Sequence, residues 1–302
     1  MTELEVDIAG IRMRNPTMLA SGILNETGLS MVAVARAGAG AVVTKSVGLE
    51  PREGHPNPCV VELDCGLINA MGLPNPGIDA YLEEVAVAQE GGVPVIGSVF
   101  GGSEEEIAEV ARRMASAGVA AVELNLSCPH AEGLGAEIGS TPDMVERICR
   151  AVKASVEVPI FAKLTPNTSS IASLASAAEE GGADGIVAIN TLRAMAICPE
   201  LGRPILSNRF GGLSGEAVRA VGVRCVYEIF DAVTIPIIGV GGVKTSKDAL
   251  EYVMAGATAV QMGTAVWSGG PGVFSDVCDG LGEFMKANGY ESVEEMRGIA
   301  HR

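Results

Sequence analysis

Hydrophobic and polar positions divide the chain into short apolar runs separated by longer stretches in which apolar residues recur at helical spacing. Proline opens four of the apolar runs, at Pro16, Pro94, Pro159 and Pro236. Four other runs follow a small–Gly–small triplet, centred on Gly38, Gly118, Gly182 and Gly256. Proline is tolerated at the first residue of a strand, and glycine commonly ends a helix. The pattern therefore predicts eight buried strands alternating with helices.

The spacing between these markers indicates one repeated unit. From each proline to the next marker glycine the separations are 22 (16 to 38), 24 (94 to 118), 23 (159 to 182) and 20 (236 to 256) residues, which fits one strand plus one helix. Strands that are apolar on both faces are typical of buried parallel sheets. We therefore predict a (β/α)8 TIM barrel that takes up residues 1–302 as one domain. The expected strands are 16–20, 41–45, 94–98, 121–125, 159–163, 185–189, 236–240 and 259–263.

Several segments lie outside the eight repeated units. Residues 4–14 alternate around Ala9 and Gly10, which predicts a hairpin that closes the bottom of the barrel. Insertions are expected after strands 2, 4 and 6, the first over 46–77 and the last over 191–214. Long loops on the carboxyl side of barrel strands usually build a functional site.

The expected strand ends carry polar residues or glycine. In chain order they are Ser21, Lys45-Ser46, Ser98, Asn125, Lys163, Asn190-Thr191, Gly241-Gly242 and Gly263-Thr264. Catalytic groups of such barrels lie at the carboxyl ends of the strands. The sequence therefore predicts that these residues meet at one mouth.

Two glycine-rich segments follow strands 7 and 8. Gly239 to Gly242 and Gly263-Thr264 let backbone N–H groups approach an anion, so they suit a phosphate cradle. The alternative is that they are only tight turns. Position 244 is Lys, so there is no GxGxxG, and no P-loop motif occurs elsewhere. A Rossmann dinucleotide site and a P-loop are both unsupported.

Two lysines and three asparagines are candidates for ligand contacts. Lys45 and Lys163 end buried strands, where a charged amine needs a partner. That partner is either a bound anion or a barrel carboxylate such as Glu123. Each asparagine offers a donor and an acceptor, which suits a neutral heterocycle with imide or amide edges. The three are Asn69, Asn125 and Asn190. For Asn69, a role as a turn residue is the alternative.

Cys128 differs from the other six cysteines in its position. It lies just past strand 4, on a loop above the expected mouth that also contains Gly133, Gly135 and Gly139. A thiolate there could accept a proton from a substrate, whereas an isolated cysteine is most often an inert buried residue.

Composition and charge restrict the partners of the protein. The 302 residues include 21 Lys and Arg against 37 Asp and Glu, for a formal net charge of −16. No basic cluster occurs that would bind nucleic acid or an anionic membrane. No apolar run reaches the length of a membrane span, and the acidic first residues are unlike a signal peptide. We therefore expect a cytoplasmic protein.

Metal binding and disulfide formation are not indicated. The seven cysteines include no CxxC pair, and the three histidines do not cluster with them.

At these positions the sequence resembles the dihydroorotate dehydrogenases, and more narrowly their class 1B catalytic subunit. The resemblance runs nearly end to end through ordered motifs: Asn15-Pro16, Ala20-Ser21-Gly22, Thr44-Lys45-Ser46, residues 68–75, residues 125–130, Ala162 to Asn167, Ile189-Asn190-Thr191, residues 211–215, Gly239 to Gly242 and Gly263-Thr264. Cysteine rather than serine at 128 is similar to class 1, and Leu164-Thr165-Pro166-Asn167 is similar to class 1B.

The resemblance implies FMN in the barrel mouth and oxidation of (S)-dihydroorotate to orotate in pyrimidine biosynthesis. It makes Cys128 the catalytic base, which takes the C5 proton while C6 delivers hydride to the flavin. The implied substrate-binding residues are Lys45, Asn69, Ala70, Met71, Gly72, Leu73, Asn125, Asn190 and Thr191. The implied FMN-binding residues are Ser21, Lys45, Ser46, Ser98, Asn125, Lys163, Ile189, Gly215, Gly241, Gly242, Gly263 and Thr264. Ser98 departs from the asparagine that several relatives carry.

Class 1B enzymes also imply a partner. The resemblance implies a homodimeric core that passes electrons to a separate subunit carrying FAD and a 2Fe-2S cluster, and then to NAD. The absence of clustered cysteines and of a dinucleotide fingerprint agrees with this division. The alternatives are a related flavin-dependent dihydropyrimidine dehydrogenase, a flavin-free barrel isomerase that binds a sugar phosphate, and a non-catalytic binding module.

Overall fold

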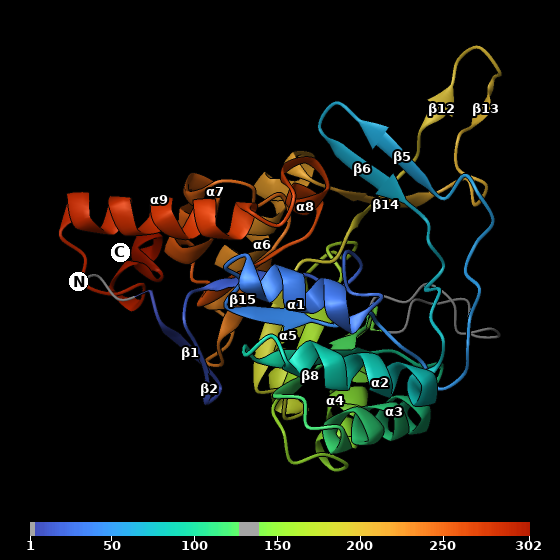
Figure 1. The fold of residues 1–302 in the computed structure, drawn as a ribbon, viewed down its shortest axis with the longest axis horizontal. Helices are drawn as coiled ribbons and strands as arrows, with labels where there is room; N and C mark the ends of the chain where they lie inside the picture. Colours follow the sequence, from blue (N-terminus) through green and yellow to red (C-terminus); the bar gives the residue numbers. More distant parts are fainter. Residues whose placement is uncertain (1–3, 127–138) are drawn as a thin grey trace.

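The computed structural model describes residues 4–126 and 139–302. Its centre is a closed barrel of eight parallel strands surrounded by helices (Figure 1). The barrel strands are β3 (Thr17–Leu19), β4 (Ala41–Val43), β7 (Val95–Val99), β8 (Ala121–Asn125), β9 (Ile160–Leu164), β10 (Gly185–Ala188), β15 (Ile237–Val240) and β16 (Ala259–Met262). All eight expected strands are confirmed, and so is the (β/α)8 barrel.

Helices follow the strands as the spacing predicts. The α-helices are α1 (Gly28–Arg36), α2 (Ile78–Gln89), α3 (Glu104–Ser116), α4 (Pro142–Lys153), α5 (Ile171–Glu180), α6 (Arg219–Phe230), α7 (Ser246–Met254), α8 (Thr264–Gly269) and α9 (Val273–Asn288). Short 3-10 turns are η1 (Glu216–Val218), η2 (Glu294–Met296) and η3 (Ile299–His301). Among the described helices, none is both long and apolar enough to cross a membrane.

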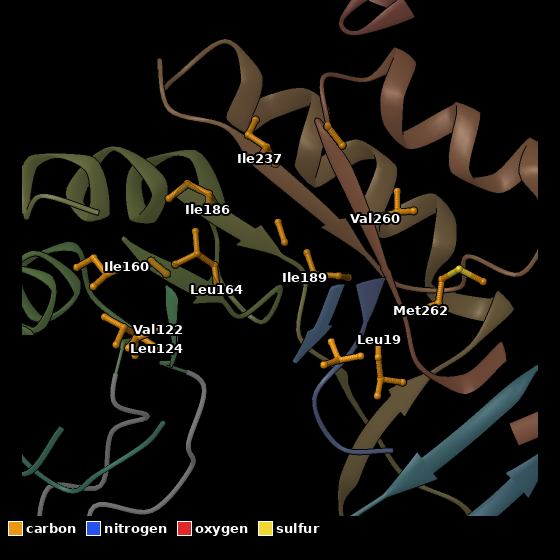
Figure 2. Packing of buried hydrophobic residues seen from close by; sticks show 14 of the residues in the cluster. Leu19, Val122, Leu124, Ile160, Leu164, Ile186, Ile189, Ile237, Val260 and Met262 are labelled. Carbon is orange, nitrogen blue, oxygen red and sulfur yellow. The ribbon is translucent and has the colours of Figure 1, made fainter. Parts of the chain in front are cut away.

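The strands present one apolar face outward to the helices. Val122 and Leu124 of β8, Ile160 and Leu164 of β9, and Val260 of β16 belong to this outer core, which Figure 2 shows in close view. Side chains alternate along a strand, so the intervening residues point into the barrel. Burial on both faces explains why these runs lack a polar stripe.

The predicted hairpin closes the lower end of the barrel. It is formed by β1 (Val6–Ile8) and β2 (Ile11–Met13), paired antiparallel. Ile8 and Met13 join a second core cluster with inward-facing residues of the barrel, including Phe161. The lower half of the barrel interior is therefore a closed apolar floor, and any site must lie at the other end.

The insertions after strands 2 and 6 form a shared sheet above the barrel. The first contributes β5 (Val60–Leu63) and β6 (Gly66–Asn69), and the second contributes β11 (Leu192–Ala194) and β14 (Gly211–Ser214). Their order is β11-β14-β6-β5, and the small hairpin β12 (Ile197–Cys198) and β13 (Arg203–Pro204) extends beyond it (Figure 1). The sheet brings two segments distant in sequence to the same side of the mouth.

Candidate active site

Polar side chains at five strand ends form one hydrogen-bonded network. The Ser46 hydroxyl lies 3.1 Å from that of Ser21 and 2.8 Å from that of Ser98. Asn125 Nδ2 donates to Ser46 Oγ at 3.3 Å, and Asn190 Nδ2 donates to Asn125 Oδ1 at 3.3 Å. These residues belong to β7 and β8 or lie two to three residues past the ends of β3, β4 and β10. The prediction that they meet at one mouth is confirmed.

Lys45 lies at this mouth but beyond the end of its strand. Its backbone N–H donates to the Tyr81 hydroxyl at 3.0 Å, and Tyr81 donates in turn to the Asn25 carbonyl. The Lys45 ammonium lies 3.6 Å from Glu26 Oε1. Tyr81 and Asn25 were not predicted from the sequence, although polar residues within apolar surroundings are a detectable signal.

Tyr81 and Asn25 are built to hold this segment rigidly. Asn25 Nδ2 donates to the carbonyls of Ala20 and Val43 at 3.1 Å each, which links the ends of β3 and β4. Burial raises the pKa of Tyr81 well above its ordinary value, so the phenol keeps its proton and remains a donor. The Lys45 backbone is thereby fixed from below.

Lys163 forms a buried triangle with two other side chains. Its ammonium lies 3.2 Å from Glu123 Oε1 and 3.3 Å from Gln261 Oε1. Gln261 Nε2 donates to Glu123 Oε2 at 2.6 Å. The pairing of Lys163 with a barrel carboxylate, one of the two alternatives, is therefore present. Gln261 was missed, although a glutamine inside the apolar run 259–262 was a visible exception.

A cavity of about 130 Å³ lies between the glycine-rich segments that were predicted as a phosphate cradle. Gly215, Gly242, Gly263 and Thr264 line it, and so does Gly66 of β6. Gly241 is adjacent, where a Cβ would stand 3.2 Å from the Tyr252 hydroxyl. The prediction that these two segments converge is confirmed. Gly242, Gly263 and Thr264 line the cavity, whereas Gly241 lies next to the lining residues.

Glycine is required at the wall of this cavity. A Cβ on Gly215 would stand 2.7 Å from Gly66 Cα, and one on Gly242 would stand 2.7 Å from the Gly215 carbonyl oxygen. Both glycines have positive φ, +96° and +70°. Within the described parts of the chain, the amide N–H groups of Gly242, Gly263 and Thr264 have no acceptor. The wall therefore offers several neutral donors to an anion.

The rim of the cavity is acidic. Glu62, Asp64 and Glu216 line it together with Lys244, whose ammonium lies 2.7 Å from Glu216 Oε1. The hydrogen bond to Glu216 raises the pKa of Lys244. The cation on the rim already has a carboxylate partner, so the backbone amides are the principal donors of the cavity.

A second group of backbone amides lies after β6. Gly72 and Leu73 have φ of +74° and +55°, and a Cβ on Gly72 would stand 2.5 Å from His55 Cδ2. In residues 4–126 and 139–302 no acceptor faces the N–H groups of Met71, Gly72 and Leu73. The N–H of Ala70 differs, because it donates to the Cys59 carbonyl at 2.8 Å. Consecutive residues with free N–H groups in such turns make an anion-binding concavity.

The sheet above the barrel places two further predicted residues together. Asn69 Nδ2 donates to the Gly212 carbonyl at 3.4 Å, and a Cβ on Gly212 would stand 2.0 Å from Thr191 Oγ1. Asn69 ends strand β6 rather than lying in a turn, so the turn alternative for it is wrong. Thr191 N donates to Asn190 Oδ1 at 2.8 Å, which connects it to the mouth network.

The remaining sequence candidates include one buried residue and several that the structure does not describe. Ile189 is 2% exposed at the end of β10, and its N–H donates to the Val240 carbonyl at 2.9 Å. Cys128 lies outside the described residues, as do Gly133 and Gly135. No three His, Cys, Asp or Glu side chains of the described segments gather as a metal site would require.

Comparison with known proteins agrees with this arrangement. The family model described as "Dihydroorotate dehydrogenase" matches residues 3–285. A protein of Methanosarcina mazei is 53% identical over 97% of this chain and 94% of its own length, and one of Methanocaldococcus jannaschii is 49% identical over 99% and 98%. One of Thermoplasma acidophilum is 50% identical over the full length of both. All three are named dihydroorotate dehydrogenase B (NAD(+)), catalytic subunit. The chain therefore belongs to the dihydroorotate dehydrogenase family.

Proposed function

We propose that this chain oxidises (S)-dihydroorotate to orotate, with FMN as its bound cofactor, in de novo pyrimidine biosynthesis. The observation that carries the proposal is full-length similarity at about half identity to proteins named for this activity. The convergence of the predicted strand-end residues at one mouth supports it independently.

The residues present fit FMN. A phosphate needs several donors at close range, and the glycine-lined cavity supplies backbone N–H groups without acceptors among the described residues. The isoalloxazine ring needs a polar edge, which the Ser21, Ser46 and Ser98 hydroxyls and the Lys163 ammonium supply. When bound there, FMN would supply the hydride acceptor of the reaction.

The residues above the barrel fit the substrate. Dihydroorotate is a ring with imide and amide edges and one carboxylate. Asn69, Asn125 and Asn190 each offer a donor and an acceptor to such edges, and the amides of residues 71–73 suit the carboxylate. The N–H of Ala70 already donates to the Cys59 carbonyl, so Ala70 would contact the substrate without donating a backbone hydrogen bond to it.

Cys128 is the proposed general base. It follows Asn125, the last residue of β8, by three positions in the sequence, and the resemblance to the dihydroorotate dehydrogenases supports its role. Its thiolate would accept the C5 proton, and Lys45, whose backbone is held by Tyr81, would orient the substrate and cofactor.

The proposed route for the electrons leads to NAD through a second subunit. The relatives are named as NAD(+)-linked catalytic subunits, which supports a partner protein. We propose that two copies of this chain form the core and that the partner carries FAD and a 2Fe-2S cluster. The cytoplasmic location stays part of the same proposal.

Anaerobic mixing of the FMN-loaded protein with candidate substrates tests the activity. We expect dihydroorotate to bleach the flavin and dihydrouracil to leave it oxidised. Bleaching by dihydrouracil alone would favour the dihydropyrimidine dehydrogenase alternative. Failure to bind FMN at all would favour the flavin-free isomerase.

The partner is tested by the electron acceptor. The isolated chain should reduce its flavin with dihydroorotate but not turn over with NAD, whereas addition of a co-purified native partner should start NADH formation. Steady NADH production by the isolated chain would refute the need for a second subunit.

A further inference from the structure

The interior of the barrel changes from apolar to polar along one plane. On three strands the residue two positions beyond the floor is charged or amide-bearing, with Ala121, Phe161 and Ala259 in the floor. The residues above them are Glu123, Lys163 and Gln261, 0%, 5% and 1% exposed. These three form the closed triangle described above, which we call the lumen triad.

The lumen triad spans the barrel. In the closed order β10-β15-β16-β3-β4-β7-β8-β9, strand β16 is four positions from β8, so Gln261 reaches Glu123 from the opposite wall. Both oxygens of Glu123 accept a hydrogen bond, one from Lys163 and one from Gln261. The carboxylate is therefore held in one place by donors from two sides of the lumen.

The two acceptors of Lys163 among the described residues leave part of its hydrogen-bonding capacity unused. An ammonium has three donors, and within the described chain its acceptors are Glu123 Oε1 and Gln261 Oε1. Lys163 pairs in register with Asn125, which belongs to the network at the mouth. The Lys163 ammonium therefore lies between its two partners, Glu123 and Gln261, and the proposed flavin site, and it has a donor left for that site.

We propose that Glu123 and Gln261 are positioning residues that set the electrostatic potential at the flavin through Lys163. This inference rests on the proposed function. A cation near the ring stabilises reduced, anionic flavin, and a buried carboxylate 3.2 Å from that cation opposes its field. Glu123 therefore lowers the affinity of the site for reduced relative to oxidised FMN, and Gln261 prevents the pair from moving apart.

Charge relocation within the lumen triad tests the proposal. Glu123→Gln removes the carboxylate with little change of shape, and the double change Glu123→Gln with Gln261→Glu returns one carboxylate to the triangle from the opposite strand. Glu109→Gln, on the exposed face of α3 where Glu109 pairs with Arg112 and Arg113, is the matched control.

The measurement is the midpoint potential of bound FMN at pH 6. We expect Glu123→Gln to raise the affinity ratio of reduced to oxidised FMN about tenfold, or about 30 mV for two electrons. The double variant should return close to the wild-type potential, and the control should not shift. A wild-type potential in Glu123→Gln, or an equal shift in the single and double variants, would overturn the inference.

A second variant covers the case in which Glu123→Gln does not fold, since it leaves a buried ammonium without its counter-charge. Glu123→Asp keeps the charge but draws it back toward β8, so the affinity ratio should rise about threefold. No shift in Glu123→Asp would then count against the inference.

FMN binding by the wild-type protein is measured first. Its absence refutes the proposed function. Urea unfolding of the flavin-free variants still tests the lumen triad in that case, because the single variant should unfold at lower urea than the double one. Equal urea concentrations at the unfolding midpoint of the single and double variants would overturn the charge coupling between Lys163 and the carboxylate.

Discussion

Gly242→Ala is expected to weaken FMN binding by blocking the phosphate cradle. The new methyl group would stand 2.7 Å from the Gly215 carbonyl oxygen and 2.9 Å from Arg219 Cβ, closer than side-chain carbons approach. The segment must therefore shift, and with it the N–H groups that face the cavity. Hydrogen bonds to a charged group contribute about 1.5–3 kcal/mol, so loss of one predicts about ten- to hundredfold weaker FMN binding.

Gly289→Ala provides the matched control. Gly289 ends α9 with φ of +77°, close to the +70° of Gly242, but no atom lies within 4 Å of a Cβ built there. Both substitutions carry the same left-handed backbone penalty of about 1–2 kcal/mol. Only the change at Gly242 alters the cavity, so a general loss of stability and a local loss of binding can be separated.

The assay is a fluorescence titration of each flavin-free variant with FMN and with riboflavin, which lacks the phosphate. Gly242→Ala should lose affinity for FMN and keep its weaker affinity for riboflavin, while Gly289→Ala should match the wild type with both ligands. Equal losses for FMN and riboflavin would refute the phosphate assignment. So would wild-type FMN affinity in a folded Gly242→Ala protein.

Three further outcomes are expected. Cys128→Ala should keep FMN bound but slow its reduction by dihydroorotate about 10² to 10⁴-fold in stopped-flow measurements, and a near-normal rate would exclude Cys128 as the base. Burial raises the pKa of Cys149 to about 12, so mass spectrometry should find this residue unmodified after treatment with an alkylating reagent at pH 8. Exposed Cys65, which lines the cavity, should be alkylated under the same conditions, and bound FMN should slow its alkylation. Tyr81→Phe should lower the free energy of unfolding by about 1–3 kcal/mol in urea titrations; unchanged stability would contradict its anchoring of Lys45.

The barrel was predictable because each strand is specified locally. A proline or a small–Gly–small triplet marks where each unit begins, and the apolar runs between these markers are short enough only for strands. The strand ends were less predictable. Strand β4 ends at Val43 rather than 45, because the Lys45 N–H donates to Tyr81 and Asn25 instead of continuing the ladder. A side chain 36 positions away decides that boundary.

The pairings between site residues that escaped prediction depend on contacts between segments distant in sequence. Glu123 and Gln261 are separated by 138 positions and meet only because β8 and β16 lie on opposite walls. Asn69 and Thr191 come together only through pairing of β6 with β14 and of β14 with β11. Local pattern carries no information on such pairs, so the sequence indicated which residues would reach the mouth but not how they would pair there.

The charges at the mouth would allow an acidic protein to select the proposed anionic cofactor, FMN. Each of three lysines there has a carboxylate partner, Lys45 with Glu26, Lys163 with Glu123 and Lys244 with Glu216. The mouth therefore has little excess positive charge, and an arbitrary polyanion gains nothing by approaching it. Selection would then fall to the neutral N–H groups of the glycine-lined cavity, which would stabilise a phosphate only when its oxygens lie within hydrogen-bonding distance. Such a site discriminates by shape and geometry, which is consistent with a net charge of −16.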